Sequence, residues 1–297
     1  MTMTPNILNH PSQLKSFLEE HRYVADDALL TSIFLLLKLH KPLLLEGPPG
    51  VGKTEAALVL SQWLNTPLIR LQCYEGLDIN AAVYEWNYQK QLLGIRMQEG
   101  SGWSLKEKES HIFSEDYLLK RPLLQAISSA DQAPVLLIDE LDRSDEEFEA
   151  FLLELLSAFQ ITIPEIGTVK AIHKPYVILT SNRTRELSDA LKRRCLYHWI
   201  DYPNLDKEMS IVGKRLPGID EQLLKQVVSN VQLIRQQKLT KTPGISETID
   251  WAESLMALGF RTITPMAVEQ TLGALLKSQE DINEISGLIS AQLESNG

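Results

Sequence analysis

The sequence predicts an α/β fold, in which a parallel sheet flanked by helices is followed by a small all-α domain. Residues 43–45 form an apolar strand that leads into a glycine-rich turn and a helix, and residues 135–138 form a second apolar strand that ends in two carboxylates. From Asp206 onward, apolar residues recur at helical spacing. We therefore expect an α/β domain with N-terminal helices over residues 1–204 and a helical domain over residues 205–297.

Composition and charge limit the classes of function. The chain has 297 residues, 44% of them hydrophobic, which suffices for one medium and one small domain. A net charge of −10 and a pI of about 5.2 argue against a protein whose main partner is a nucleic acid. Two widely spaced cysteines, Cys73 and Cys195, favour a reducing compartment, and we expect the cytoplasm. The most apolar stretch, residues 33–39, is too short for a membrane span, and the N-terminus does not resemble a signal peptide.

Two amphipathic helices are predicted before the first strand, over residues 11–20 and from about Asp26 to Leu39. The loop between them carries Tyr23 and Val24. These two side chains are candidates for contact with the adenine of a nucleotide. A packed core position is an equal alternative for Tyr23.

Residues 47–54, Gly-Pro-Pro-Gly-Val-Gly-Lys-Thr, match the phosphate-binding loop pattern Gly-x-x-x-x-Gly-Lys-Thr. Its glycines lack a Cβ, so backbone N–H groups can surround a phosphate. Lys53 would reach the β and γ phosphates of ATP, and Thr54 would bind Mg²⁺ at the start of the following helix. The candidate nucleotide-binding residues are Tyr23, Val24, Gly47, Pro48, Pro49, Gly50, Val51, Gly52, Lys53, Thr54 and Glu55.

A second strand and a less regular segment follow this helix. Residues 68–73 alternate as a strand, which completes a parallel strand-helix-strand unit. The next segment is expected to contain a helix near residues 76–83, a strand-like piece at 86–93, an exposed loop at 99–110 and a helix at 122–130.

The strand that starts at Val135 ends in Asp139 and Glu140, at the end of a parallel sheet where ligands bind. Beside a phosphate loop, the first carboxylate is expected to hold Mg²⁺ through water, and the second to orient and deprotonate the attacking water. A third buried strand, residues 176–182, ends in Asn182. Its amide would position that water or contact the γ-phosphate, or would merely cap the following turn.

A helix from Asp145 and a β-hairpin at residues 161–171 are predicted between these two strands. After the third strand, residues 189–195 place three cations together, and residues 199–203 are predicted to form the edge strand that closes the sheet. A basic run is usually a solvated face. Here it lies at the rim of the domain, where a neighbouring subunit could receive an arginine.

These motifs together resemble an AAA+ ATPase, and more closely the MoxR family. In that resemblance, residues 47–54 are the Walker A motif, residues 136–140 the Walker B motif, Asn182 sensor 1 and Arg194 the arginine finger. Residues 118–124 and 243–251 resemble the CoxD-like branch, encoded beside molybdenum-containing carbon monoxide dehydrogenases. Thr248 stands where many relatives carry a sensor 2 arginine.

The resemblance implies an ATP-hydrolysing chaperone that uses ATP and Mg²⁺ and helps to mature a metal centre. It implies a homo-oligomeric ring, with a hexamer favoured, a client protein and a von Willebrand factor A domain partner. The catalytic residues would be Glu140, Asn182 and Arg194, and the Mg²⁺ ligands Thr54 and Asp139. Two alternatives stay open: an ATP-binding switch or scaffold with incidental hydrolysis, and a DNA-processing AAA+ protein, which the acidic charge disfavours.

Overall fold

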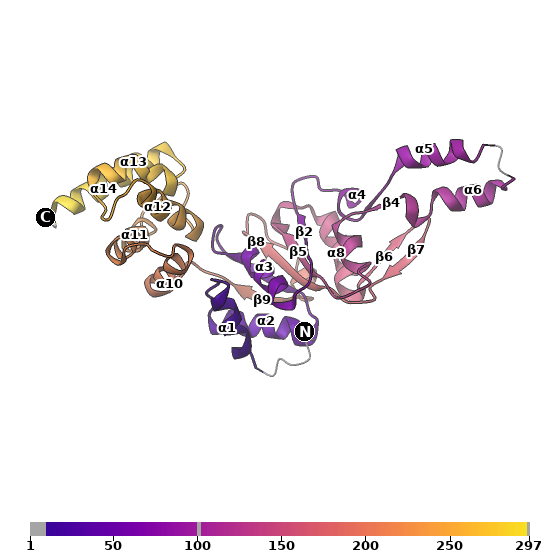
Figure 1. Cartoon of the computed structure of the whole chain (residues 1–297), viewed down its shortest axis with the longest axis horizontal. Coiled ribbons are helices and arrows are strands. Elements are labelled where there is room, and N and C mark those ends of the chain that lie inside the picture. Colours follow the sequence, from indigo (N-terminus) through magenta and orange to yellow (C-terminus); the bar gives the residue numbers. More distant parts are fainter. Residues whose placement is uncertain (1–9, 100–101, 296–297) are drawn as a thin grey trace. The chain divides into compact units, whose positions relative to one another are not determined.

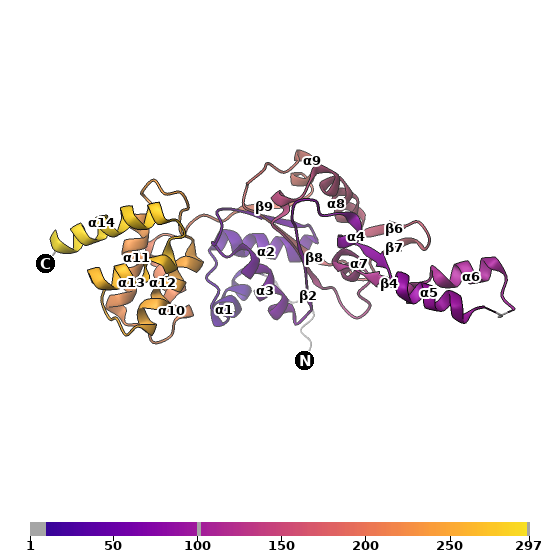
Figure 2. The same cartoon turned by 90° about the horizontal axis from the view of Figure 1, so that it is seen from above.

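The computed structural model describes residues 10–99 and 102–295 and divides into two compact units. The first unit contains Asp27–Glu46 and Ala57–His198, and the second contains Ser12–Asp26, Gly47–Ala56 and the chain from Trp199 onward. Figures 1 and 2 show the elements from two sides.

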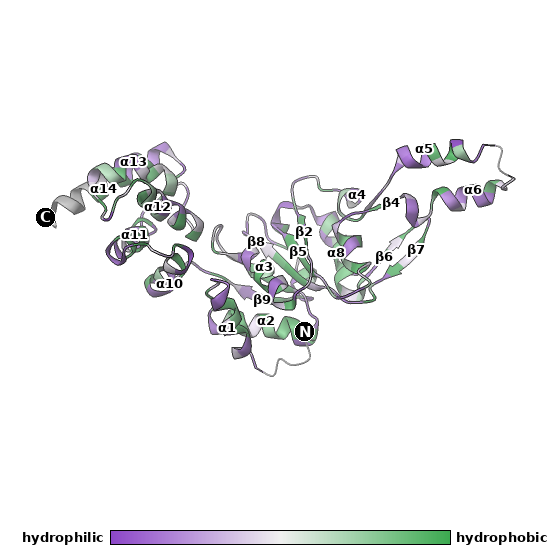
Figure 3. Cartoon of the chain, in the orientation of Figure 1, coloured by the Kyte–Doolittle hydropathy of each residue, from purple (hydrophilic) through white to green (hydrophobic). Residues whose placement is uncertain are grey.

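The first unit is built on a five-stranded sheet with the strand order β2-β5-β8-β1-β9. Its strands are β1 (Leu43–Glu46), β2 (Leu68–Gln72), β5 (Val135–Asp139), β8 (Tyr176–Ser181) and β9 (Leu196–Trp199). β2 pairs with β5, β5 with β8, and β8 with β1, all in parallel. Every residue of β1, β5 and β8 is buried, and Figure 3 colours the strand labelled β5 mostly as hydrophobic. The predicted parallel sheet is confirmed.

Helices and two small hairpins complete the first unit. The helices are α2 (Asp27–Leu39), α3 (Lys53–Leu64, which begins in the second unit), α4 (Ile79–Ala82), α7 (Pro122–Ile127), α8 (Glu146–Ala158) and α9 (Asp189–Lys192), with 3₁₀ turns at Glu115–Tyr117 and Leu141–Arg143. One hairpin pairs β3 (Tyr84–Trp86) with β4 (Leu118–Lys120), and the other pairs β6 (Gln160–Ile163) with β7 (Gly167–Lys170). The second hairpin confirms the prediction for residues 161–171, and the helices expected near 76–83 and 122–130 are present but shorter.

Three predictions of secondary structure are wrong. Residues 88–93 are not a strand but belong to helix α5 (Tyr88–Met97), because the side chain of Asn87 accepts a hydrogen bond from the Lys90 N–H and caps the helix. The polar stretch at 99–110 is not all loop, since helix α6 (Leu105–Ile112) begins within it. The edge strand is β9 and not residues 199–203, because the Leu196 N–H already donates to the Pro42 carbonyl at 2.7 Å.

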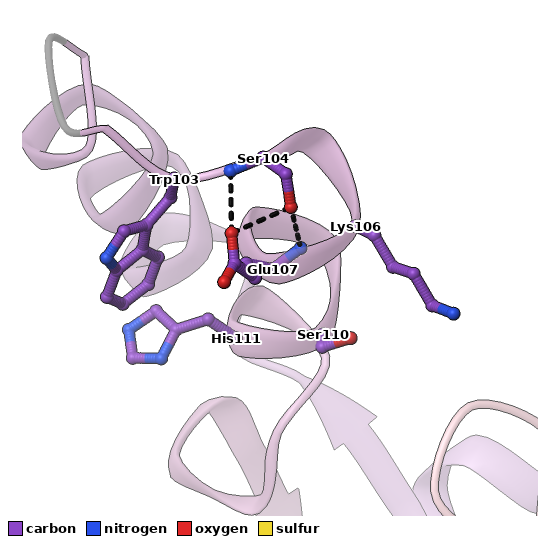
Figure 4. Close-up of a pocket in the computed structure, with 6 residues that line it drawn as sticks. All are labelled: Trp103, Ser104, Lys106, Glu107, Ser110 and His111. Atoms are coloured by element: carbon purple, nitrogen blue, oxygen red, sulfur yellow. Dashed lines mark hydrogen bonds between the residues drawn. The ribbon is translucent and has the colours of Figure 1, made fainter.

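Helices α5 and α6 run side by side as an arm that extends away from the sheet, between β3 and β4 in the chain (Figures 1 and 2). A pocket of about 650 Å³ lies on α6, and Figure 4 shows its lining residues. Ser104 and Glu107 there form a reciprocal capping box, and the His111 ring packs edge-on against Trp103 with the ring centres 5.2 Å apart. The Ser104 hydroxyl and the Glu107 carboxylate in this pocket thus form hydrogen bonds with each other and with the helix backbone.

The second unit is a helical bundle together with the first helix of the chain and the glycine-rich loop. Its helices are α1 (Ser12–Glu20), α10 (Leu205–Arg215), α11 (Glu221–Ile234), α12 (Ile245–Ala257), α13 (Pro265–Leu275) and α14 (Gln279–Ser295). The core of the bundle surrounds Trp251, whose indole N–H donates to the Thr271 hydroxyl at 2.8 Å. The predicted helical C-terminal region is confirmed, and the domain boundary after residue 204 stays a prediction.

A membrane span was not expected from the sequence. Across residues 10–99 and 102–295, no helix has the length and apolar character that crossing a bilayer requires.

Candidate functional site

The glycine-rich loop directly follows β1 and leads into α3, as the motif requires. Gly50 and Gly52 have φ angles of +74° and +91°, a region that side chains with a Cβ rarely adopt. A Cβ on Gly47 would lie 2.0 Å from the Ile200 carbonyl oxygen, so only glycine fits there. The Lys53 Nζ donates to the carbonyls of Gly47 at 2.7 Å and Pro48 at 2.6 Å, which holds the loop curled around the ammonium group. A curled loop of this kind fits a phosphate group.

Tyr23 lies against this loop. Its side chain is buried, and its hydroxyl donates to the Gly52 carbonyl at 3.3 Å. Burial, and then the carboxylates of Glu55 and Asp26, raise the pKa of Tyr23, so the hydroxyl remains a donor at neutral pH. Val24 follows in the same loop and is half-buried. The contact of Tyr23 and Val24 with adenine stays a prediction.

The start of α12 also packs on the loop, a contact that the sequence analysis missed. The Ile245 N–H donates to the Gly50 carbonyl at 3.0 Å. A Cβ on Gly244 would lie 2.8 Å from the Pro49 carbonyl, so the two backbones approach closely. The signal in the sequence was a glycine immediately before a helix in the C-terminal region. Thr248, on the next turn, is fully buried, and its hydroxyl donates to Glu208 at 2.8 Å within the helical bundle.

The two carboxylates at the end of β5 are fixed by strand β8. Asp139 is buried, and its Oδ1 accepts a hydrogen bond from the Thr180 hydroxyl at 2.5 Å. Glu140 has a left-handed backbone, with φ +54° and ψ +48°, and its N–H donates to the same hydroxyl at 2.9 Å. A non-glycine residue in this region is strained, and such strain is common at functional sites. Thr180, which the sequence analysis did not single out, therefore positions the Asp139 carboxylate and the backbone of Glu140.

The Glu140 side chain has partners on three elements. Its Oε2 accepts from Gln72 Nε2 at 3.1 Å and lies 3.1 Å from Arg143 Nε. Its Oε1 lies 3.5 Å from Asn182 Nδ2, which is long for a hydrogen bond but close enough for both groups to contact one water beside them. The structure thus brings the predicted pair Glu140 and Asn182 together.

Strand β2 supplies two further polar side chains to these carboxylates. The β2–β5 register places Gln72 opposite Asp139, and Arg70 lies two residues earlier on the same face of β2. Arg70 donates to Asp139 Oδ2 through Nε at 3.1 Å and Nη2 at 2.5 Å. The only sequence signal was a pair of long polar residues at alternate positions of an otherwise apolar strand.

Asp142 holds the loop that follows β8. It is buried and accepts hydrogen bonds from the Asn182 N–H at 3.1 Å, the Thr184 N–H at 2.9 Å and the Thr184 hydroxyl at 2.6 Å. Burial alone would raise the pKa of Asp142, but these hydrogen bonds outweigh it, and the pKa lies below its usual value. Asp142 therefore stays ionised and fixes the backbone of Asn182.

Arg194 is exposed after α9, and its partners are not carboxylates. Its Nε donates to the Ser157 hydroxyl at 2.7 Å, and its Nη1 donates to the Ala190 carbonyl at 2.9 Å. Within the described ranges, Arg194 forms no ion pair. Its role as an arginine finger stays a prediction.

The predicted Mg²⁺ ligands, Thr54 and Asp139, both carry oxygen, which Mg²⁺ prefers. Mg²⁺ commonly binds one or two protein oxygens together with phosphate oxygens and water. Over the ranges that the structure covers, no three His, Cys, Asp or Glu side chains gather into a ready-made metal site. Thr54 lies in the first turn of α3, and Asp139 is the last residue of β5. Their role as Mg²⁺ ligands stays a prediction.

Residues 42–195, which hold this loop, both carboxylates and Asn182, match the AAA domain (dynein-related subfamily). The chain belongs to this family. It is 27% identical over 276 residues to an uncharacterized protein of Staphylococcus epidermidis, covering 90% of this chain and 95% of the relative. It is 26% identical over 279 residues to an uncharacterized protein of Staphylococcus aureus, covering 92% and 97%.

A solved structure shares the fold of this AAA protein. A RuvB variant from Thermotoga maritima superposes with a TM-score of 0.50 at 17% identity, over 84% of this chain and 70% of that chain. The fold is that of the AAA+ phosphate-loop NTPases, which are nucleotide-binding proteins of the ATPase class.

Proposed function

We propose that this AAA protein is a Mg²⁺-dependent ATPase that remodels a client protein as part of a homo-oligomeric ring. The observation that carries the proposal is the position of Glu140. This carboxylate directly follows the central strand β5 and lies beside Asn182. It lies at the carboxyl edge of the parallel sheet to which β1, the strand that leads into the phosphate loop, also belongs. A module that only binds nucleotide needs no such base.

Each residue has a chemical role in this proposal. The backbone N–H groups of the loop and Lys53 would hold the phosphates, and Thr54 and Asp139 would hold Mg²⁺. Glu140 would take a proton from the attacking water, which Asn182 would orient. When bound, Mg²⁺ would neutralise charge on the phosphates.

The cellular role is the finer part of the proposal. The resemblance to MoxR-like and CoxD-like proteins favours a cytoplasmic chaperone in the maturation of a molybdenum hydroxylase, with a von Willebrand factor A domain partner and a hexameric ring. An ATP-binding switch is the second candidate. A DNA-processing role is disfavoured by the net charge of −10.

Two substitutions test the proposed site. Lys53→Ala should reduce ATP binding at least tenfold, because it removes the cation that faces the phosphates. Glu140→Gln should bind ATP with unchanged affinity and lose hydrolysis by a factor of about 10² or more, because the amide keeps the shape and lacks basicity. ATP affinity and phosphate release measure the two effects.

The matched control is Glu147→Gln, an equal change at an exposed position of α8. It should leave both measurements unchanged. If Glu140→Gln hydrolyses ATP at the normal rate, the catalytic base is another residue. If Lys53→Ala binds ATP with normal affinity, residues 47–54 are not the nucleotide-binding site.

A further inference from the structure

Arg70 forms an ion pair with the carboxylate that is assigned to Mg²⁺. Both Arg70 contacts go to one oxygen, Asp139 Oδ2, whereas Thr180 occupies Oδ1. Both oxygens of the Asp139 carboxylate therefore accept hydrogen bonds from the protein, and the Asp139 side chain is only 3% exposed. The Arg70 side chain is 52% exposed, so it can turn toward solvent without leaving a buried charge of its own.

Arg70 is also linked to the second carboxylate. Its Nη2 donates to Gln72 Oε1 at 2.7 Å, and Gln72 Nε2 donates to Glu140 Oε2 at 3.1 Å. Arg70 and Gln72 lie on one face of β2, so a chain of hydrogen bonds runs from Asp139 to Glu140 across a neighbouring strand. Arg70 and Gln72 therefore connect the two carboxylates through side chains of β2 alone.

We infer that Arg70 is a counter-ion to Asp139 which Mg²⁺ must displace, so that Arg70 sets the Mg²⁺ concentration at which nucleotide binds. The inference rests on the proposed function, which makes Asp139 a Mg²⁺ ligand. A guanidinium and a divalent cation repel each other. If the two charges are about 6 Å apart and are screened as strongly as in water, the repulsion weakens Mg²⁺ binding roughly tenfold. When Mg²⁺ displaces Arg70, Gln72 loses its hydrogen bond from Arg70. Gln72 can then move away from Glu140, to which it also donates.

The test measures binding of the non-hydrolysable analogue AMPPNP as Mg²⁺ is titrated, with the whole chain. Arg70→Gln and Arg70→Met, which lack the charge, should reach half-saturation at a Mg²⁺ concentration about tenfold lower than wild type. Arg70→Lys keeps the charge and should stay within twofold to threefold of wild type. Thermal unfolding establishes that each variant is folded. If Arg70→Gln does not fold, Arg70→Met provides the measurement in its place.

Arg121→Gln is the matched control, because Arg121 forms a half-exposed ion pair with Glu85 on the β3–β4 hairpin. It should leave the Mg²⁺ requirement unchanged. An equal or higher Mg²⁺ requirement in the neutral Arg70 variants would overturn the role of Arg70 and leave the proposed function standing. Failure of wild type to bind AMPPNP even at saturating Mg²⁺ would overturn both.

Discussion

At the scale of single residues, two neighbouring strands hold the Asp139 carboxylate, through Arg70 on β2 and Thr180 on β8. Of the residues at this site, the phosphate loop and the polar ends of the strands could be predicted from the sequence, because each is a local pattern. Lys53, Asp139 and Asn182 follow from a loop motif and from strands that end in polar side chains. Arg70 and Thr180 could not be predicted, because their partners depend on which strands are neighbours and in which register. The order β2-β5-β8 brings them to Asp139 from both sides.

Asp142 carries a prediction on pH dependence. Its folded pKa lies below the unfolded value of about 3.9, so the carboxylate contributes stability above that pH and loses it as the pH falls through the folded pKa. Asp142→Asn should lower the free energy of unfolding at pH 7 by about 1.5–3 kcal/mol, since it weakens charge-assisted hydrogen bonds to buried donors. Urea unfolding from pH 7 to pH 3 measures this.

The same pH series can also contradict the assigned role of Asp142. The difference in unfolding free energy between wild type and Asp142→Asn should shrink below about pH 4, because wild type then loses the same charge. A difference that is constant with pH would show that the hydrogen bonds of Asp142 do not depend on its ionisation.

At the scale of elements, sequence periodicity identified the buried strands and the long amphipathic helices but failed in the arm. Apolar residues at alternate positions near Trp86 predicted a strand, yet only β3 is extended and α5 follows it. The Asn87 cap and the capping box of Ser104 and Glu107 start the two helices. The Ser-x-x-Glu signal was present in the stretch that was predicted to be a loop.

The helical bundle contains a buried ion pair, between Arg235 and Glu208, whose contribution to stability can be predicted. Arg235 donates to both oxygens of Glu208, at 2.6 and 2.7 Å, and the Glu208 side chain is 0% exposed. Arg235→Ala should destabilise the bundle by about 3–5 kcal/mol, because it leaves a buried carboxylate without a counter-charge. Chemical denaturation measures the loss.

The control is Lys207→Ala, which removes an ion pair to Asp26 that is more exposed to solvent. It should cost less than about 1 kcal/mol. Equal losses in the two variants would mean that burial does not determine the contribution of these pairs.

At the scale of the whole molecule, the assembly remains a proposal, and Arg194 offers its test. An arginine supplied to a phosphoryl-transfer transition state contributes roughly 10³ to 10⁵ in rate. If Arg194 acts on ATP in the neighbouring subunit, Arg194→Ala should lose most hydrolysis and keep ATP affinity. Mixing Arg194→Ala with Lys53→Ala should restore part of the ATPase rate, because mixed rings contain some complete sites.

Arg193→Ala is the control, since it removes a neighbouring charge from the same segment, and it should retain most activity. No recovery in rings shown to be mixed, or full activity of Arg194→Ala alone, would exclude the trans role. Loss of activity only in Arg193→Ala would assign that role to Arg193.

The hydrogen bond from the Ile245 N–H to the Gly50 carbonyl has a consequence for observing the molecule at work. Both partners are main-chain atoms, so the bond itself involves no side chain, and it depends on the local shape of the phosphate loop and of the start of α12. We expect the Ile245 amide proton to exchange with deuterium slowly while this hydrogen bond is intact and faster when it breaks. Comparing its deuterium uptake with and without nucleotide would measure whether the loop opens at this point, and no attached label is needed.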